Sequence, residues 1–145
     1  PAARVCAGAE RRTVAQNRRM TPHRFLLAAI AVMAMAGASA RADVIDIAWS
    51  AEGGFEHRAE VAPGGLAEVC GKLAHGTAVR WAFESAGPMD FNIHYHEGKK
   101  VVFPVRRAGA TKGAATLKVK LDQDYCWMWS NKSTQPLALQ LTLAR

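Results

Sequence analysis

Residues 90–105 show the clearest alternation of apolar and polar side chains in the sequence. Such alternation is typical of β-strands that bury one face and expose the other. The apolar positions before the central turn are Phe91, Ile93 and Tyr95, and those after it are Val101, Phe103 and Val105. The turn is Glu97-Gly98-Lys99. The pattern therefore predicts a β-hairpin with an apolar inner face and with His94 and His96 on its outer face.

Similar runs recur on both sides of this hairpin. Alternating or β-branched runs cover residues 44–49, 55–61, 66–73, 79–84, 116–121, 125–129 and 137–143. Turn residues separate them, and we find no helical periodicity beyond residue 42. About eight short strands with regularly spaced turns are typical of an antiparallel β-sandwich. The predicted fold class is therefore all-β, with a single domain at 43–145.

Residues 20–42 have the layout of a secretory signal peptide. Arg24 precedes an apolar run at 25–36, which is too short to span a bilayer comfortably. Small residues follow, with cleavage sites after Ala40 and Ala42. We expect the segment to be removed, leaving a periplasmic or secreted protein with no membrane span.

Residues 1–19 are basic and carry no apolar pattern, so we expect an over-extended reading frame or a leader. The whole sequence has 19 Lys and Arg against 12 Asp and Glu. Six of these basic residues and one acid precede residue 41, which leaves 13 basic residues against 11 acidic ones. The overall basicity thus belongs to the leader. Because nucleic-acid binding usually needs a basic face, no nucleic-acid partner is predicted.

Two cysteines, Cys70 and Cys126, belong to the expected domain. In an exported domain a disulfide is their simplest role, and it would close the sandwich. Closing the loop between these two cysteines would stabilise the fold by about 4 kcal/mol in the chain-entropy model. The alternative is a pair of free thiols that bind a metal.

The order of these features resembles a known family. A cysteine sits on an early strand in Glu68-Val69-Cys70, and a strand that begins with glycine follows at 76–83. Next come a strand and turn at 90–98 and an aromatic-cysteine strand ending in Ser-Asn at 125–131. Over about residues 61–143 this order resembles the GOLD (Golgi dynamics) domain, the lumenal β-sandwich of eukaryotic secretory-pathway cargo receptors.

The resemblance implies a disulfide between Cys70 and Cys126 and a protein- or lipid-interaction module instead of an enzyme. It does not include the coiled coil, membrane span and sorting tail of the cargo receptors, so a role in membrane trafficking does not carry over. The alanine-rich leader indicates a secreted bacterial relative.

His94 and His96 form the most suggestive pair for chemistry. Because they are two positions apart on a strand, their imidazoles leave the same face, and their Cα atoms are about 7 Å apart. With a third ligand such a pair binds copper or zinc. The candidates for that ligand are His57, His75 and Glu97, of which His57 is the best. The alternative is a solvated polar face.

The sequence lacks the common motifs of enzymes and of blue-copper sites. There is no Gly-x-Ser-x-Gly elbow, phosphate-binding glycine loop or His-Glu-x-x-His motif. A blue-copper site needs a histidine soon after its cysteine, and none follows Cys126. Four aromatic residues are predicted to fill the core and not to form a ligand platform: Trp81, Tyr125, Trp127 and Trp129.

We therefore predict a non-catalytic binding module that contacts a protein or an envelope ligand. The alternative is a periplasmic copper- or zinc-binding protein that uses the His94 and His96 pair.

Overall fold

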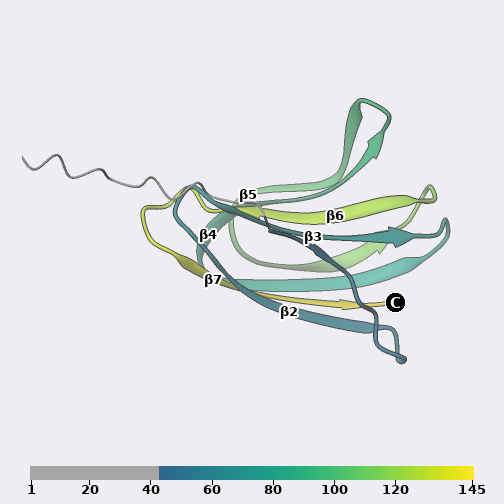
Figure 1. Ribbon diagram of the computed structural model, residues 1–145, viewed down its shortest axis with the longest axis horizontal. Helices are drawn as coiled ribbons and strands as arrows, with labels where there is room; N and C mark the ends of the chain where they lie inside the picture. The colour runs from purple at the N-terminus through teal and green to yellow at the C-terminus, as the bar shows by residue number, and fades with distance from the viewer. Residues whose placement is uncertain (1–42) are drawn as a thin grey trace, which may run out of the picture. The chain divides into compact units, whose positions relative to one another are not determined.

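The computed structural model describes residues 43–145, which form seven β-strands (Figure 1). The strands are β1 (Asp43–Asp46), β2 (Gly54–Val61), β3 (Leu66–Leu73), β4 (Ala78–Glu97), β5 (Lys100–Lys118), β6 (Gln123–Ser130) and β7 (Leu137–Ala144). The signal peptide and the segment before it, expected at 1–42, lie outside the described residues. Over 43–145, no helix is long and apolar enough to cross a membrane.

The strands form a curled sheet in the order β1-β3-β6-β4-β7-β2, with β5 paired to β4. The long strand β4 links the two layers, because its residues 80–85 pair with β7 and its residues 90–94 pair with β6. Figure 1 shows β3 and β6 in one layer and β2 and β7 in the other. The predicted all-β sandwich is confirmed, with one parallel pair, β1 with β3.

The turn expected around Gly87 and Pro88 lies inside β4, so two predicted strands form one. A register shift between Glu84 and Met89 accommodates the proline, which has no N–H for the ladder. Gly87 lies against Leu137, where a Cβ would come within 2.8 Å of Cδ2. The sequence signals of a turn thus mark a bend in a continuous strand. Residues 106–113, which lie between two of the predicted strands, likewise belong to β5.

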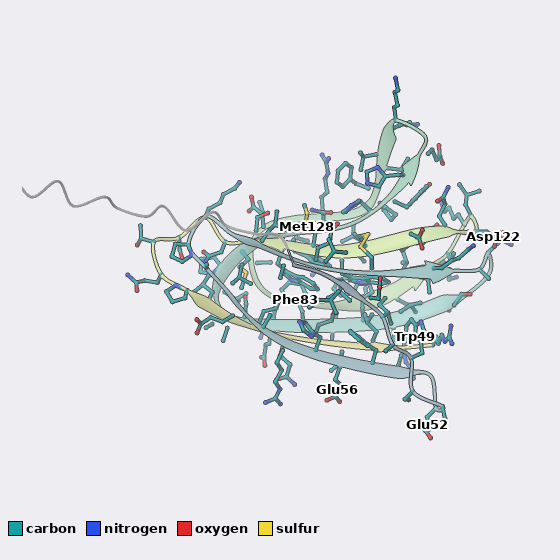
Figure 2. All side chains as sticks on the ribbon, viewed as in Figure 1. Trp49, Glu52, Glu56, Phe83, Asp122 and Met128 are labelled. Atoms are coloured by element: carbon teal, nitrogen blue, oxygen red, sulfur yellow. A yellow bond between two sulfur atoms is a disulfide. The ribbon has the colours of Figure 1, made fainter. Side chains whose placement is uncertain are left out.

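The core between the layers is rich in aromatic rings. Phe83 lies between the two layers in Figure 2, with its ring centroid 4.6 Å from that of Phe91 and 5.5 Å from that of Trp129. Trp81 lies 5.1 Å from Phe91. The four aromatic residues predicted to fill the core are almost fully buried, which confirms that assignment. Rings in this arrangement supply much of the apolar surface that stabilises a small domain.

The hairpin of β4 and β5 follows only half of the predicted pattern. Its first strand does bury Phe91, Ile93 and Tyr95. In the second strand the expectation holds for Val105, which pairs with Ile93 and packs against the core. It was wrong for Val101 and Phe103, because the register shifts between Ile93 and Tyr95. Val102 pairs with Tyr95, while Val101 pairs with His96 on the outer face and is 38% exposed.

Candidate functional site

His94 lies at the base of the hairpin and is buried, with 6% of its surface exposed. The sequence predicted a polar outer face here, and His94 does point to that side, opposite Ile93 and Tyr95. It is nevertheless shielded, because the register shift brings Phe103 onto the same face, with ring centroids 5.7 Å apart. On the side away from β5, His94 is paired with Cys126 of the neighbouring strand β6. The alternative of a solvated polar face therefore does not hold at His94.

Both ring nitrogens of His94 have oxygen partners. Nε2 lies 3.2 Å from Oε1 of Glu68, and Nδ1 lies 2.9 Å from Oδ1 of Asn92. A neutral imidazole carries one N–H and donates to one of these oxygens, whereas the imidazolium donates to both. Burial lowers the pKa of His94, the Glu68 carboxylate raises it, and His96 lowers it further. Because burial has the largest effect, the pKa lies below the ordinary value and the ring is neutral near pH 7.

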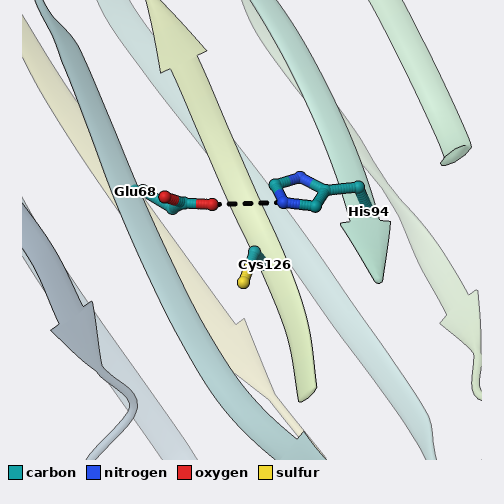
Figure 3. Close-up of side chains that lie close together, drawn as sticks. All are labelled: Glu68, His94 and Cys126. Atoms are coloured by element: carbon teal, nitrogen blue, oxygen red, sulfur yellow. Dashed lines mark ion pairs between the residues drawn. The ribbon is translucent and has the colours of Figure 1, made fainter. Parts of the chain in front are cut away.

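Three potential metal donors meet on this face. Glu68, His94 and Cys126 each offer an atom, and these atoms lie within 4.8 Å of one another (Figure 3). The sulfur of Cys126 is bonded to Cys70, as the sequence predicted, and a disulfide sulfur is not a thiolate ligand. In the oxidised protein this group therefore keeps only the carboxylate and the imidazole, and these contact each other.

The three predicted metal ligands do not gather at one point. His94 and His96 are neighbours, with ring centroids 5.4 Å apart. His57 lies on β2 of the other layer, paired with buried Leu141, and stacks on Phe55. Since its side chain faces the interior while His94 faces outward from the opposite layer, His57 is not placed to complete the site.

The other two candidates for a third ligand lie elsewhere. His75 is exposed in the turn between β3 and β4, where its backbone N–H donates to Asp122. Glu97 is exposed at the tip of the hairpin.

Two residues of the site, Glu68 and Asn92, were missed in the sequence. A signal for each was available, because residues two apart on a strand share a face. Glu68 precedes Cys70 by two, and Asn92 precedes His94 by two. Only the pairing of β3, β6 and β4 brings these faces together.

The tip of the hairpin extends beyond the rest of the sheet. The last residue of β4 that pairs with β6 is His94. Within residues 43–145, the residues that follow pair only across the hairpin, such as Tyr95 with Val102 and Glu97 with Lys100. In Figure 1 this green hairpin rises away from β6. The arrangement presents exposed residues at 96–101 on a buried, hydrogen-bonded base.

Comparisons with known proteins identify the fold. No protein-family model matches the sequence, and no curated protein matches it. The pre-peptidase C-terminal domain of collagenase from Bacillus anthracis matches with a TM-score of 0.56 and 9% identity, over 71% of this chain and 96% of that one. PliG from Aeromonas hydrophila, a periplasmic inhibitor of g-type lysozyme, matches with a TM-score of 0.55 and 7% identity, over 72% and 96%.

PliG from Salmonella Typhimurium matches with a TM-score of 0.50 and 5% identity, over 72% of this chain and 98% of that one. At these identities the likeness concerns the fold. Residues 43–145 thus have the fold of small β-sandwich domains.

Proposed function

We propose that this protein is an exported, non-catalytic binding module, of GOLD-like type, that contacts another protein through the tip of its β4–β5 hairpin. The observation that carries the proposal is the free tip itself. Among residues 43–145 no strand other than its own partner pairs with the hairpin beyond His94, and residues 96–101 are all exposed, so the tip is open to a partner. Binding residues are commonly held in this way on a projecting segment above a rigid sheet.

The chemistry of the tip suits a protein surface. Val101 is an exposed apolar side chain, and His96 lies opposite it. Glu97, Lys99 and Lys100 supply charges of both signs. An apolar residue with a charged rim is the arrangement that protein interfaces use.

The base of the hairpin is held in place before a partner arrives. His94 contacts Glu68 across β6, and the guanidinium of Arg106 stacks over Phe103 at 3.5 Å from the ring centroid. A pre-organised segment loses less conformational entropy on binding, which favours affinity.

The structural neighbours support an exported protein-binding role. Two of them are periplasmic lysozyme inhibitors, whose partner is a protein, and a third is a domain of a collagenase. The disulfide between Cys70 and Cys126 suits an oxidising compartment. The GOLD resemblance points the same way, toward an interaction module.

Site-specific photo-crosslinking tests this function. A photo-reactive amino acid is placed at Val101 of the hairpin or, as a control, at Ala138, which is exposed on β7. We expect the variant at 101 to form one saturable adduct with an envelope protein in cells and the variant at 138 to form none. The purified partner should then bind the domain directly. Equal adducts at both positions, or an adduct whose protein does not bind in isolation, contradicts the proposal.

Metal handling is a second candidate function, favoured by the adjacent rings of His94 and His96 beside the Glu68 carboxylate. Imidazole and carboxylate donors suit copper and zinc. A metal would have to displace Glu68 or Asn92 from the ring of His94. Titration of the oxidised domain with Zn²⁺ and Cu²⁺ tests this role. The absence of binding at micromolar concentrations, or binding unchanged by His94→Ala with His96→Ala, contradicts it.

A further inference from the structure

The charges of the described domain are strongly segregated. Residues 99–120 contain seven Lys and Arg and no Asp or Glu. The remaining residues of 43–145 contain five basic side chains against eleven acidic ones. Most of the basic segment is β5, so the domain has one positive edge and a negative remainder. A charge separation of this kind steers association with a partner of opposite charge.

The basic strand lies at an edge of the sheet. Among the strands that the structure describes, β5 pairs with β4 alone, which leaves the backbone groups of its other side without a neighbouring strand there. From Lys112 to Lys118 its register with β4 is unbroken, and Pro104 lies outside this stretch. Three consecutive small residues, Gly113, Ala114 and Ala115, place little side-chain bulk beside this backbone, and the two alanines are exposed. Such an edge can accept an added strand.

Two arginines extend this edge toward the hairpin. The guanidinium of Arg106 lies over Phe103, and that of Arg107 lies 5.4 Å from the ring centroid of Trp81. Within the described part of the chain, the ion pairs are His94 with Glu68 and Lys132 with Asp90, so neither arginine is neutralised by a carboxylate. Stacking orients a guanidinium and leaves its N–H groups available for a carboxylate.

We propose that the edge of β5 from Arg106 to Lys118 binds an extended acidic segment of a partner polypeptide. The inference rests on the proposed function and names the chemistry of the partner. Backbone groups of the edge pair with the segment, while the arginines and the flanking Lys112 and Lys118 contact its carboxylates. A second copy of this chain fits poorly, because antiparallel pairing centred on Ala115 places Lys112 opposite Lys118, and like charges across a sheet are destabilising.

Poly-L-glutamate provides an extended acidic polypeptide as the probe. Its binding to the oxidised domain is measured by titration calorimetry at low and high salt, and mapped by amide chemical shifts. We expect saturable binding that weakens with salt, with shifts concentrated at residues 106–118. Shifts concentrated on β2 or β3 overturn the proposal. So does equally tight binding of a single-stranded DNA oligonucleotide to residues 106–118, since the edge then recognises charge alone.

Two double variants test whether binding depends on the residues of this edge or only on the net charge of the domain. Arg106→Gln with Arg107→Gln should weaken binding about tenfold or more, because both guanidiniums contact the probe. The control, Arg58→Gln with Lys72→Gln, removes the same charge from exposed positions on β2 and β3 and should change binding less than about twofold.

Equal loss in both variants overturns the proposal, as does the absence of binding by the wild type. If the arginine variant fails to fold, Lys112→Gln with Lys118→Gln takes its place. A partner captured at Val101 without binding of poly-L-glutamate overturns this inference and leaves the proposed function standing.

Discussion

Glu68 and His94 contact each other across the strand that lies between them, with 3.2 Å between Oε1 and Nε2. Glu68 belongs to β3 and His94 to β4, and β6 with Cys126 lies between them. Both side chains are largely shielded from solvent, at 16% and 8% exposed. The contact ties the base of the hairpin to the sheet, next to the disulfide, while residues 96–101 of the tip are exposed.

The pH dependence of stability should report on His94. Burial lowers its pKa in the folded state, so below about pH 6.5 the unfolded chain takes up the proton more readily. The free energy of unfolding should therefore be highest above this pH and should fall as the pH drops from about 7 to 5. Urea denaturation at several pH values between about 7 and 5 measures this fall in the free energy of unfolding. His94→Gln should flatten the slope, and the exposed control His75→Gln should not. A wild-type stability that rises on acidification would contradict the account.

Removal of the disulfide should cost stability through the unfolded state. Cys70 and Cys126 are 56 residues apart, and releasing a loop of this size costs about 4 kcal/mol in the chain-entropy model. Cys70→Ala with Cys126→Ala should lower the free energy of unfolding by about that amount in chemical denaturation. The wild type measured after reduction should agree with the double variant. A loss below about 1 kcal/mol would show that the crosslink contributes little.

Asn131 should be among the most sensitive polar positions. Its side chain is fully buried, and Nδ2 donates to the carbonyl oxygens of Val61 and Gln135. Its Oδ1 accepts from the backbone N–H of Ser133. Asn131→Ala removes these hydrogen bonds, although the Gln135 carbonyl still accepts one from Ser133 Oγ. The change should cost about 3 kcal/mol in thermal or urea unfolding. Gln135→Ala is the control, because Gln135 contributes only its backbone, and its effect should stay within about 0.5 kcal/mol. Equal effects would refute this role.

Substitution of Gly113 should destabilise the domain, because core aromatic rings lie directly against this glycine. A Cβ at this position would lie 2.7 Å from Cε1 of Phe83 and 3.1 Å from Cζ3 of Trp81. Gly113→Ala should therefore destabilise the domain by about 1–3 kcal/mol, as overpacking does. Ala114→Ser, at the exposed neighbouring position, should be close to neutral. Calorimetric melting compares the two, and a neutral Gly113→Ala would show that the rings move aside.

Sequence periodicity predicted the fold class and much of the core, because period-two alternation depends on local backbone geometry. Phe91, Ile93 and Tyr95 are buried as expected. The predictions failed where the backbone departs from regular pairing: the alternation failed at the shift that turns Val101 outward, and the turn expected near Gly87 is a bend within β4. Such irregularities depend on long-range pairing, so a turn and a bend look alike in the sequence.

The candidate site was only partly predictable for the same reason. His94 was found from its spacing to His96, but its burial depends on Phe103 and on the pairing with β6. Glu68 lies 26 positions before His94 and meets it only through the order of β3, β6 and β4. The segregation of charge was visible in the sequence, whereas its position on a free edge required the topology.

The most direct test of the proposed binding role is the affinity of the crosslinked partner for hairpin variants. Val101→Asp, at an exposed position of the tip, should weaken the Kd by about tenfold or more while the free energy of unfolding is unchanged. Ala138→Asp on exposed β7 serves as the matched control and should leave the Kd within about twofold. An unchanged Kd for Val101→Asp, or an equal loss for both variants, would contradict binding through the hairpin tip.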